Sequence, residues 1–376
     1  MYFRLNPECY FIKGKRQGAI FDLINCKIYA LNPEETKILT LCEKNNSIPQ
    51  TIDFLDDLKK LCLGNYYPKK TYIQKLRVGS PIESDEHLKP PELFRAFLEI
   101  NNECDKYCDF CGLNGIKRSS GCMGCNVWNE NDDPITLEKW KEVIDELKYL
   151  NCQEIFISGG DLTLQWAKTI EILDYANGKF MNIYVTLHQQ NISKNIINDL
   201  ENKANLIIQT EDINILKSNE FIYLLTVKPE NWDFNHVDNG NIILDFVVED
   251  KNLTKQPHYK KEFPPVNLYQ FINNIEYHPC LGHTLTICYN GNVIPCPMMR
   301  HSILGNLCNN ALHTIFREKL AEIDKFWKLN LDKIENCTGC EFRYICTDCR
   351  ALEENITGRL NGKSMCSYNP EIGEWL

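Results

Sequence analysis

The sequence lacks a long apolar segment and an excess of basic residues, and each absence excludes a class of protein. The longest apolar runs, within FIYLLTV and NIILDFVV, are far shorter than the roughly 20 residues that a membrane-spanning helix needs. The first residues, MYFRLNPECYFIKGKR, do not contain the continuous apolar segment of a signal peptide. The net charge of -10 argues against nucleic acid as the main partner, because binding to a phosphate backbone normally needs a basic face. We therefore expect a cytoplasmic protein with no membrane or nucleic-acid partner.

Cysteine, in contrast, is abundant, with 19 residues in a chain of 376. In a reducing compartment, clustered cysteines usually indicate metal binding or redox catalysis rather than disulfides. The length predicts two to three domains, each with enough chain for a core of its own.

The most informative stretch is NNECDKYCDFCG. It contains Cys104, Cys108 and Cys111, which we name the triplet. Thiols separated by three and then two residues can bind three irons of a cubane cluster and leave the fourth iron open. An iron with an open coordination position is a place for chemistry. A zinc knuckle or a set of buried thiols is the alternative interpretation.

This run resembles the motif of the radical S-adenosylmethionine (SAM) family. The resemblance implies a 4Fe-4S cluster whose open iron chelates the amino and carboxylate groups of SAM. One electron, delivered to the cluster by a flavodoxin-type or ferredoxin-type donor, then cleaves SAM to a 5'-deoxyadenosyl radical. The resemblance also implies that the ring of Phe110 lies beside the adenine.

Strands and helices alternate through the middle of the chain. FRAFLEI, QEIFISGGD, MNIYVTLHQ and ANLIIQT read as strands, and TLEKWKEVIDELKYL, QWAKTIEILDYANG and SKNIINDLENK as the helices between them. This pattern predicts an α/β fold with a full or partial (β/α) barrel over residues 89–265, whose site lies at the carboxyl ends of the strands. The proline-containing segment IESDEHLKPPEL is the predicted linker before it.

Further candidate site residues follow two of these strands. Ser158, Gly159, Gly160 and Asp161 come directly after the second strand, where glycines permit close approach of a ligand and the acid can accept a hydrogen bond from an ammonium group. They resemble the Gly-Gly-Glu motif that holds the SAM amine, with Asp in place of Glu. An ordinary turn is the alternative.

The end of the fourth strand contributes two more candidates. Gln209 and Glu211 are placed like polar SAM-contacting residues of the family, although any barrel carries polar residues at such positions.

Residues 1–88 predict a small α+β unit of winged-helix type. CYFIKG and GAIFDLINCKIYALN read as strands, Asn32 and Pro33 open a helix in PEETKILTLCEKN, and further helices are predicted in SIPQTIDFLDDLKKLCLG and KKTYIQKLR. The unit resembles the peptide-recognition element of peptide-modifying enzymes, in which a strand edge takes up the leader of a precursor peptide. A cap that only supports the barrel is the alternative.

Residues 266–376 contain a second cysteine block, which begins with a predicted hairpin, ICYNGNVIPC, that turns at Asn290 and Gly291. The order of the cysteines resembles the SPASM domain, an auxiliary-cluster module of radical SAM enzymes, except that Cys346 and Cys349 are separated by two residues instead of three. The resemblance implies that Cys280, Cys296 and Cys349 hold a first auxiliary 4Fe-4S cluster, with Cys288 as fourth ligand or with an iron open to a substrate thiolate. It implies a second auxiliary cluster on four further cysteines: Cys337, Cys340, Cys346 and Cys366. Two zinc sites are the alternative.

Cys122 and Cys125 form a pair in the loop after the triplet. They are candidates for metal binding, hydrogen-atom donation or redox relay near the radical site, and inert surface thiols are the alternative.

Together the motifs resemble a radical SAM/SPASM maturase. This implies an enzyme that oxidatively crosslinks residues of a ribosomally made precursor peptide, because auxiliary clusters can accept the electron that such an oxidation releases. The alternatives are a redox-neutral peptide epimerase, a maturase of a larger protein of the sulfatase-activating kind, and a non-catalytic scaffold that binds the leader peptide.

Overall fold

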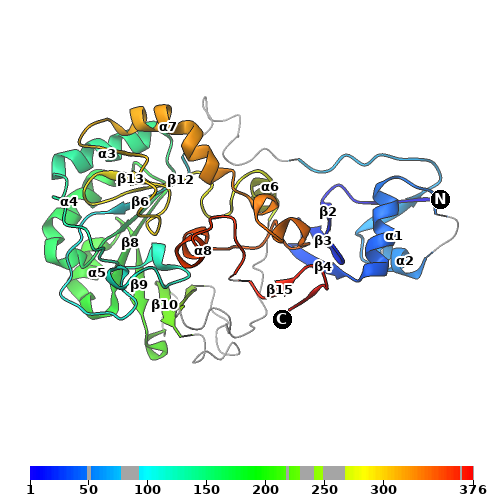
Figure 1. Cartoon of the computed structure of the whole chain (residues 1–376), viewed down its shortest axis with the longest axis horizontal. Helices are drawn as coiled ribbons and strands as arrows, with labels where there is room; N and C mark the ends of the chain where they lie inside the picture. The colour runs from blue at the N-terminus through cyan, green and yellow to red at the C-terminus, as the bar shows by residue number, and fades with distance from the viewer. Residues whose placement is uncertain are drawn as a thin grey trace.

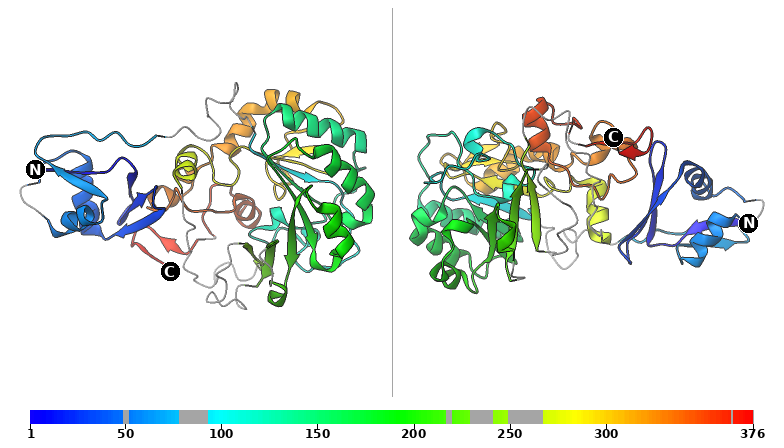
Figure 2. Two further views of the ribbon diagram at one scale, coloured as in Figure 1. Left: turned by 180° about the vertical axis from the view of Figure 1, so that it is seen from behind. Right: turned by 90° about the horizontal axis from the view of Figure 1, so that it is seen from below.

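The computed structural model describes residues 1–48, 52–77, 93–216, 220–228, 241–248, 267–364 and 366–375. The molecule is elongated, with an N-terminal unit at one end and a large α/β layer at the other (Figure 1). Helices α6 (Leu268–Glu276) and α8 (Arg350–Thr357) lie between these two parts, and the views from behind and below agree on this arrangement (Figure 2).

The N-terminal unit is an α+β structure, as predicted. Asn32 caps the first helix, because its side chain accepts hydrogen bonds from the backbone of Glu34 and Glu35 while the Glu35 carboxylate accepts from the backbone of Asn32. One antiparallel sheet has the order β2-β3-β4, and a separate pair joins β1 to β5. The elements are β1 (Tyr2–Leu5), β2 (Cys9–Lys13), β3 (Gly18–Asp22), β4 (Lys27–Leu31), α1 (Pro33–Glu43), α2 (Asp53–Lys60) and β5 (Gly64–Tyr67).

The prediction of a helix in KKTYIQKLR is wrong. Residues 71–77 form no regular element, because tertiary hydrogen bonds hold the chain against the start of the domain. The Lys75 ammonium donates to the carbonyl oxygens of Asn6 and Cys9, and the Leu76 backbone N–H donates to the carbonyl of Pro7. Most of the predicted linker IESDEHLKPPEL lies outside the described residues.

The middle of the chain forms six parallel strands that are neighbours in chain order. Helices α3, α4 and α5 follow the first three strands and cover one face of the sheet (Figure 1). This arrangement confirms the α/β fold with a partial (β/α) barrel. The elements are β6 (Arg95–Glu99), α3 (Leu137–Tyr149), β7 (Glu154–Ser158), α4 (Trp166–Ala176), β8 (Asn182–His188), α5 (Lys194–Leu200), β9 (Asn205–Thr210), β10 (Ile222–Val227) and β11 (Ile242–Phe246).

The C-terminal part continues the same sheet. Strand β12 pairs in parallel with β6, and β13 and β14 follow antiparallel, which gives the order β11-β10-β9-β8-β7-β6-β12-β13-β14. The hairpin turns at Gly291, whose φ of 82° is the left-handed conformation that favours glycine. The sheet therefore crosses the predicted boundary at residue 266. The elements are β12 (Thr284–Ile287), β13 (Asn292–Ile294), β14 (Gly305–Asn306), α7 (Leu312–Trp327), β15 (Tyr368–Asn369) and β16 (Glu374–Trp375).

The N-terminal unit packs on the C-terminal domain through aromatic rings. Phe271 of α6 lies 5.0 Å from the ring of Tyr10, 5.2 Å from that of Phe21 and 5.6 Å from that of Tyr344. Aromatic pairs at such distances add to the stabilisation from buried area. In the described part of the chain, no helix combines the length and apolar character needed to cross a membrane.

Candidate active site

The carboxyl ends of the barrel strands surround a pocket of about 390 Å³. The three cysteines of the triplet lie along it, on the loop that follows β6. Strands β7, β8 and β9 and the segment after the triplet supply the rest of the wall. The lining residues are Cys104, Lys106, Cys108, Cys111, Cys125, Asn126, Val127, Gly160, Asp161, His188, Asn191 and Gln209.

Backbone donors point at two of the triplet sulfurs. The N–H of Lys106 lies 3.4 Å from Sγ of Cys104, and the N–H of Val127 lies 3.4 Å from Sγ of Cys111. Such hydrogen bonds favour the thiolate form and tune the potential of an iron-sulfur cluster. Burial raises the pKa of Cys104 and of Cys108, so a bound cation is needed to keep them ionised. Three soft thiolates, two of them with backbone donors, fit an iron-sulfur cluster with one iron left for a further ligand.

A single zinc ion needs its ligands close together. Four thiolates around zinc, each at about 2.3 Å, must approach one another closely. Within the described residues, no three His, Cys, Asp or Glu side chains are grouped so that they could hold a single metal ion.

The two glycines after β7 attach that strand to the triplet loop. A Cβ on Gly160 would lie 2.1 Å from the carbonyl oxygen of Glu103, and Gly159 has a φ of 149° with Asn101 directly beside it. The N–H of Gly160 donates to the Asn101 side chain at 2.9 Å, and the N–H of Asp161 donates to the carbonyl of Glu103 at 2.6 Å. Gly160 lines the pocket, whereas Gly159 and the buried Ser158 lie behind it. The glycines therefore position the triplet.

Asp161 lies in the pocket and already binds an ammonium group. Its Oδ2 is 3.2 Å from Nζ of Lys106, and its Oδ1 accepts hydrogen bonds from the backbone and hydroxyl of Thr163. Burial alone would raise the pKa of Asp161, but the hydrogen bonds from Thr163 and Lys106 outweigh burial and lower it. Asp161 is thus an ionised acceptor at neutral pH.

The ends of β8 and β9 add two buried polar side chains. Gln209 accepts a hydrogen bond from the backbone N–H of Cys125 at 2.7 Å, which joins the fourth strand to the loop after the triplet. His188 lies on the pocket wall, and burial lowers its pKa, so its ring is neutral at neutral pH. Glu211 is exposed and does not line the pocket, although its charge acts on Cys108.

Phe110 faces an adjoining cavity of about 180 Å³ instead of the triplet pocket. The guanidinium of Arg118 lies 5.1 Å from its ring centroid, a cation–π contact. Arg118 is itself buried and forms an ion pair with Asp245 of β11 at 3.2 Å. The aromatic residue of the triplet is therefore held by a buried cation from the same loop.

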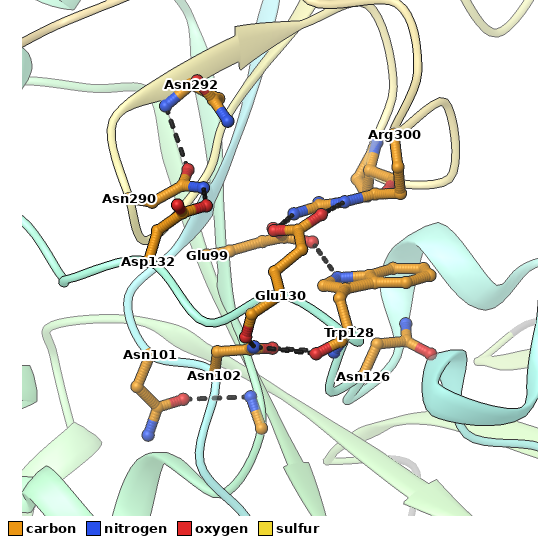
Figure 3. Close-up of polar contacts among 12 residues, drawn as sticks. Glu99, Asn101, Asn102, Asn126, Trp128, Glu130, Asp132, Asn290, Asn292 and Arg300 are labelled. Atoms are coloured by element: carbon orange, nitrogen blue, oxygen red, sulfur yellow. Dashed lines mark hydrogen bonds and ion pairs between the residues drawn. The ribbon is translucent and has the colours of Figure 1, made fainter.

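A second, largely buried arginine joins the triplet loop to the C-terminal hairpin (Figure 3). Arg300 donates to both carboxylate oxygens of Glu130, at 2.8 and 2.7 Å, and to Glu99 at the end of β6, at 2.7 Å. Its guanidinium lies 4.7 Å from the ring of Trp128, whose indole N–H donates to the same Glu99. Asn102 bonds to the backbone of Trp128 in both directions, which carries the connection back to the triplet loop. We name these residues the Arg300 clamp.

The cysteines of the C-terminal block form two groups. The first contains Cys337, Cys340, Cys346 and Cys366. Burial, followed by the charge of Asp348 and of the neighbouring Cys346 and Cys366, raises the pKa of Cys337 to about 12. Cys280, Cys296 and Cys349 form the other group, in which charge on Cys280 and Cys349 raises the pKa of Cys296 in addition to burial. The two ligand sets stay predictions.

Cys288 stands apart from both groups. Its thiol is buried beside Glu99, Arg300 and Glu130 of the clamp, and burial together with the charge of Glu99 raises its pKa well above the usual value. Cys122 and Cys125 lie in two different places. Cys125 lines the triplet pocket, whereas Cys122 packs with Cys296 and Cys349 in an apolar cluster.

Comparisons with known proteins identify one part of the chain. Residues 280–341 match the SPASM family, an iron-sulfur cluster-binding domain. This segment is a SPASM domain, which confirms the predicted iron-sulfur module of the C-terminal block.

Three solved structures resemble the SPASM-containing chain at low identity. SuiB of Streptococcus suis bound to S-adenosylmethionine is 12% identical, with 93% of this chain and 96% of that chain covered and a TM-score of 0.44. SuiB bound to the precursor peptide SuiA is 15% identical, with the same coverages and TM-score. BtrN in an open conformation is 12% identical, with 66% of this chain and 92% of that chain covered and a TM-score of 0.36. No curated protein matches the chain.

Sequence reasoning missed four residues of this region: Lys106, Arg118, His188 and Arg300. His188 had a signal, because it is the last residue of the third barrel strand and Gln209 is the last but one of the fourth. Lys106 lies inside the triplet itself. The two arginines had none, because the carboxylates that pair with them are far away in the sequence.

Proposed function

We propose that the protein is a radical SAM enzyme that oxidatively crosslinks residues of a ribosomally made precursor peptide. One observation carries the proposal: the three triplet thiols share a pocket with Gly160, Asp161 and Gln209, which come from the ends of two other strands. A pocket that combines soft thiolates, an ionised carboxylate and neutral polar groups suits an iron-sulfur cluster together with a zwitterionic ligand.

A 4Fe-4S cluster bound by Cys104, Cys108 and Cys111 would supply the electron that cleaves SAM reductively to a 5'-deoxyadenosyl radical. The side chains around it would bind and orient the cofactor. Asp161 already accepts from the Lys106 ammonium, so the SAM amine would enter the same hydrogen-bond position. Gln209 and the clamp would hold the loop after the triplet over the pocket, which limits access of water to a reactive species.

The N-terminal unit would recruit the substrate. In the described residues its sheet ends at β4, whose outer edge pairs with no further strand, and such an edge can accept an extended peptide as an added strand. The unit packs on the C-terminal domain through α6, so a bound leader would be tethered to the enzyme and raise the effective concentration of the rest of the peptide. The iron-sulfur domain between the two ends would take up the electron released by an oxidative crosslink.

The test is anaerobic reconstitution followed by assays for 5'-deoxyadenosine and for the mass of a precursor peptide encoded near the enzyme. We expect reductive SAM cleavage and a peptide lighter by two hydrogens, both lost in Cys108→Ala. Cys308→Ala is the matched control, because this exposed cysteine is distant from the pocket and should leave both activities unchanged. SAM cleavage that survives in Cys108→Ala would contradict the cluster assignment, and a wild-type protein that never cleaves SAM would favour a leader-binding scaffold.

A peptide epimerase is the second candidate, and the position of Cys125 favours it. This thiol lines the triplet pocket, and burial raises its pKa to about 12, so it carries its hydrogen at neutral pH. It could give a hydrogen atom to a substrate carbon radical, after which the thiyl radical needs one electron and one proton to return to the thiol. Deuterium incorporation at a Cα in heavy water, without a mass loss of two hydrogens, would select this reaction, and Cys125→Ala would abolish it.

A further inference from the structure

The strongest unexplained feature is a fourth thiol beside Cys280, Cys296 and Cys349. It belongs to Cys122, which comes from the barrel loop and not from the cysteine block. Cys122, Cys296 and Cys349 pack in one cluster with Trp128, Leu281, Met298, Met299 and Ala351. Cys280 directly precedes Leu281 of this cluster, so all four thiols belong to one packed region.

The residue expected in this position lies elsewhere. Cys288 is enclosed by the clamp, where its neighbours are two carboxylates and a guanidinium instead of other cysteines. A thiol between carboxylates is poorly placed to share a cluster that already carries several thiolates. Its backbone N–H also donates to Asn292 within the hairpin, so the residue is tied to the sheet.

The backbone around Cys122 is fixed in a way that sends Cys122 and Cys125 in different directions. Residues Gly121–Met123 form a 3-10 turn. The Asn126 side chain donates to the carbonyl oxygens of Gly121 and Gly124, at 2.7 and 3.4 Å, which bridges both ends of the turn. Gln209 accepts from the N–H of Cys125 at the triplet pocket, while a Cβ on Gly121 would be 3.4 Å from the sulfur of Met298, a member of the cluster that Cys122 packs against.

Two of the three C-terminal cysteines are held by hydrogen bonds of the kind found around metal ligands. His278 accepts hydrogen bonds from the backbone of Cys280 and Leu281 through Nδ1, and its Nε2 lies 2.9 Å from Asp348. The sulfur of Cys349 accepts from the N–H of Leu352 at the start of α8, where the helix dipole favours negative charge. Hydrogen bonds of this kind orient metal ligands.

We propose that Cys122 is the fourth thiolate ligand of the auxiliary cluster held by Cys280, Cys296 and Cys349. This inference rests on the iron-sulfur part of the proposed function and extends it. A cluster with four protein thiolates has no open iron, so it does not bind a substrate thiol and serves only to transfer electrons. The chain from Cys122 to Cys125 then runs from this cluster to the wall of the triplet pocket, which provides a short covalent path between the two centres.

The experiment compares the full-length wild type with Cys122→Ala, Cys288→Ala and Cys308→Ala, each reconstituted anaerobically. Three clusters correspond to about 12 irons per chain in the wild type. In Cys122→Ala we expect the loss of one to four irons and either a 3Fe-4S signal in electron paramagnetic resonance or a 4Fe-4S spectrum that added cyanide shifts. The other two variants should keep the wild-type iron content and a spectrum of the auxiliary clusters that cyanide does not change.

Far-UV circular dichroism of a Cys122→Ser variant controls for loss of fold, since this nearly isosteric change should lower iron content while the helix signal stays that of the wild type. Wild-type iron and spectra in Cys122→Ala, or their loss in Cys288→Ala, would overturn the proposal. If the wild type holds its irons but does not cleave SAM, the proposed reaction fails while the ligand assignment stands.

Discussion

Replacing Arg300 by methionine should destabilise the protein because it leaves a buried carboxylate without its cation. The Glu99 side chain is 4% exposed and the Arg300 side chain 10% exposed, so water cannot solvate the charge that remains. Removing one partner of a buried pair typically costs about 3–5 kcal/mol. Because Trp128 would still donate one hydrogen bond to Glu99, we expect a decrease of about 3 kcal/mol in the free energy of unfolding, at the lower end of that range.

The loss should depend on pH, with a sign that follows from Glu99. Burial raises the pKa of Glu99, and Arg300 opposes that rise. A carboxyl whose pKa is raised in the folded state costs stability as the pH climbs above its unfolded value of about 4.3. Without Arg300 the pKa rises further, so the variant should be closer to the wild type at pH 5 than at pH 8.

Anaerobic urea titration at the two pH values measures these differences, with the double variant E99Q/R300M as the matched control. The amide removes the buried charge, so the double variant should regain about 2 kcal/mol relative to R300M at pH 8. A stabilising role for the clamp is refuted if the free energy of unfolding of R300M lies within about 0.5 kcal/mol of the wild-type value. It is also refuted if the double variant is no more stable than R300M, because the ion pair in the clamp would then not stabilise the fold.

Two further perturbations address the pocket itself. In Gly160→Ala the new Cβ would lie 2.1 Å from the carbonyl of Glu103, so the triplet loop must move and SAM cleavage should fall about 10–100-fold. Gly178→Ala is the control: the position has open space around it, so the change should lower the free energy of unfolding by only about 1 kcal/mol because of its left-handed φ. Equal SAM cleavage in the two variants would refute the role of Gly160 in positioning the triplet. Lys106→Met removes a group that lowers the pKa of Asp161, whose stabilising charge is lost as pH falls through that pKa. The acid unfolding midpoint, followed by circular dichroism, should therefore move to higher pH in this variant but not in the surface control Lys139→Met, and an unchanged midpoint would mean that the ion pair contributes nothing.

Much of the fold could be predicted because its signals are local. The alternation of strand and helix patterns predicted the parallel barrel strands, and the Asn-Gly pair predicted the hairpin turn. Asn32 with Pro33 predicted the start of α1. The segment KKTYIQKLR has a helical composition and is nevertheless irregular, because Lys75 and Leu76 bond to the first residues of the chain. Tertiary contacts outweighed a weak local preference there.

The candidate site likewise has parts that the sequence predicts and parts that only tertiary contacts determine. The triplet and the residues at strand ends are visible in the sequence because parallel strands bring their carboxyl ends together. The division of Cys122 and Cys125 between two places is not visible, since it depends on how one turn packs between Gln209 and Met298. The position of Cys288 beside Glu99 likewise depends on β12 pairing with β6, a contact between residues far apart in the chain.

The pairing of β12 with β6 has a practical consequence for any attempt to express parts of the protein separately. Strand β6 has β7 on one side and β12 on the other, so a barrel expressed without the C-terminal segment would present a bare row of backbone donors and acceptors next to the triplet loop. Exposed edges of that kind promote self-association. A truncated protein would tend to aggregate before it could be loaded with iron, and its inactivity would say nothing about which half performs the chemistry.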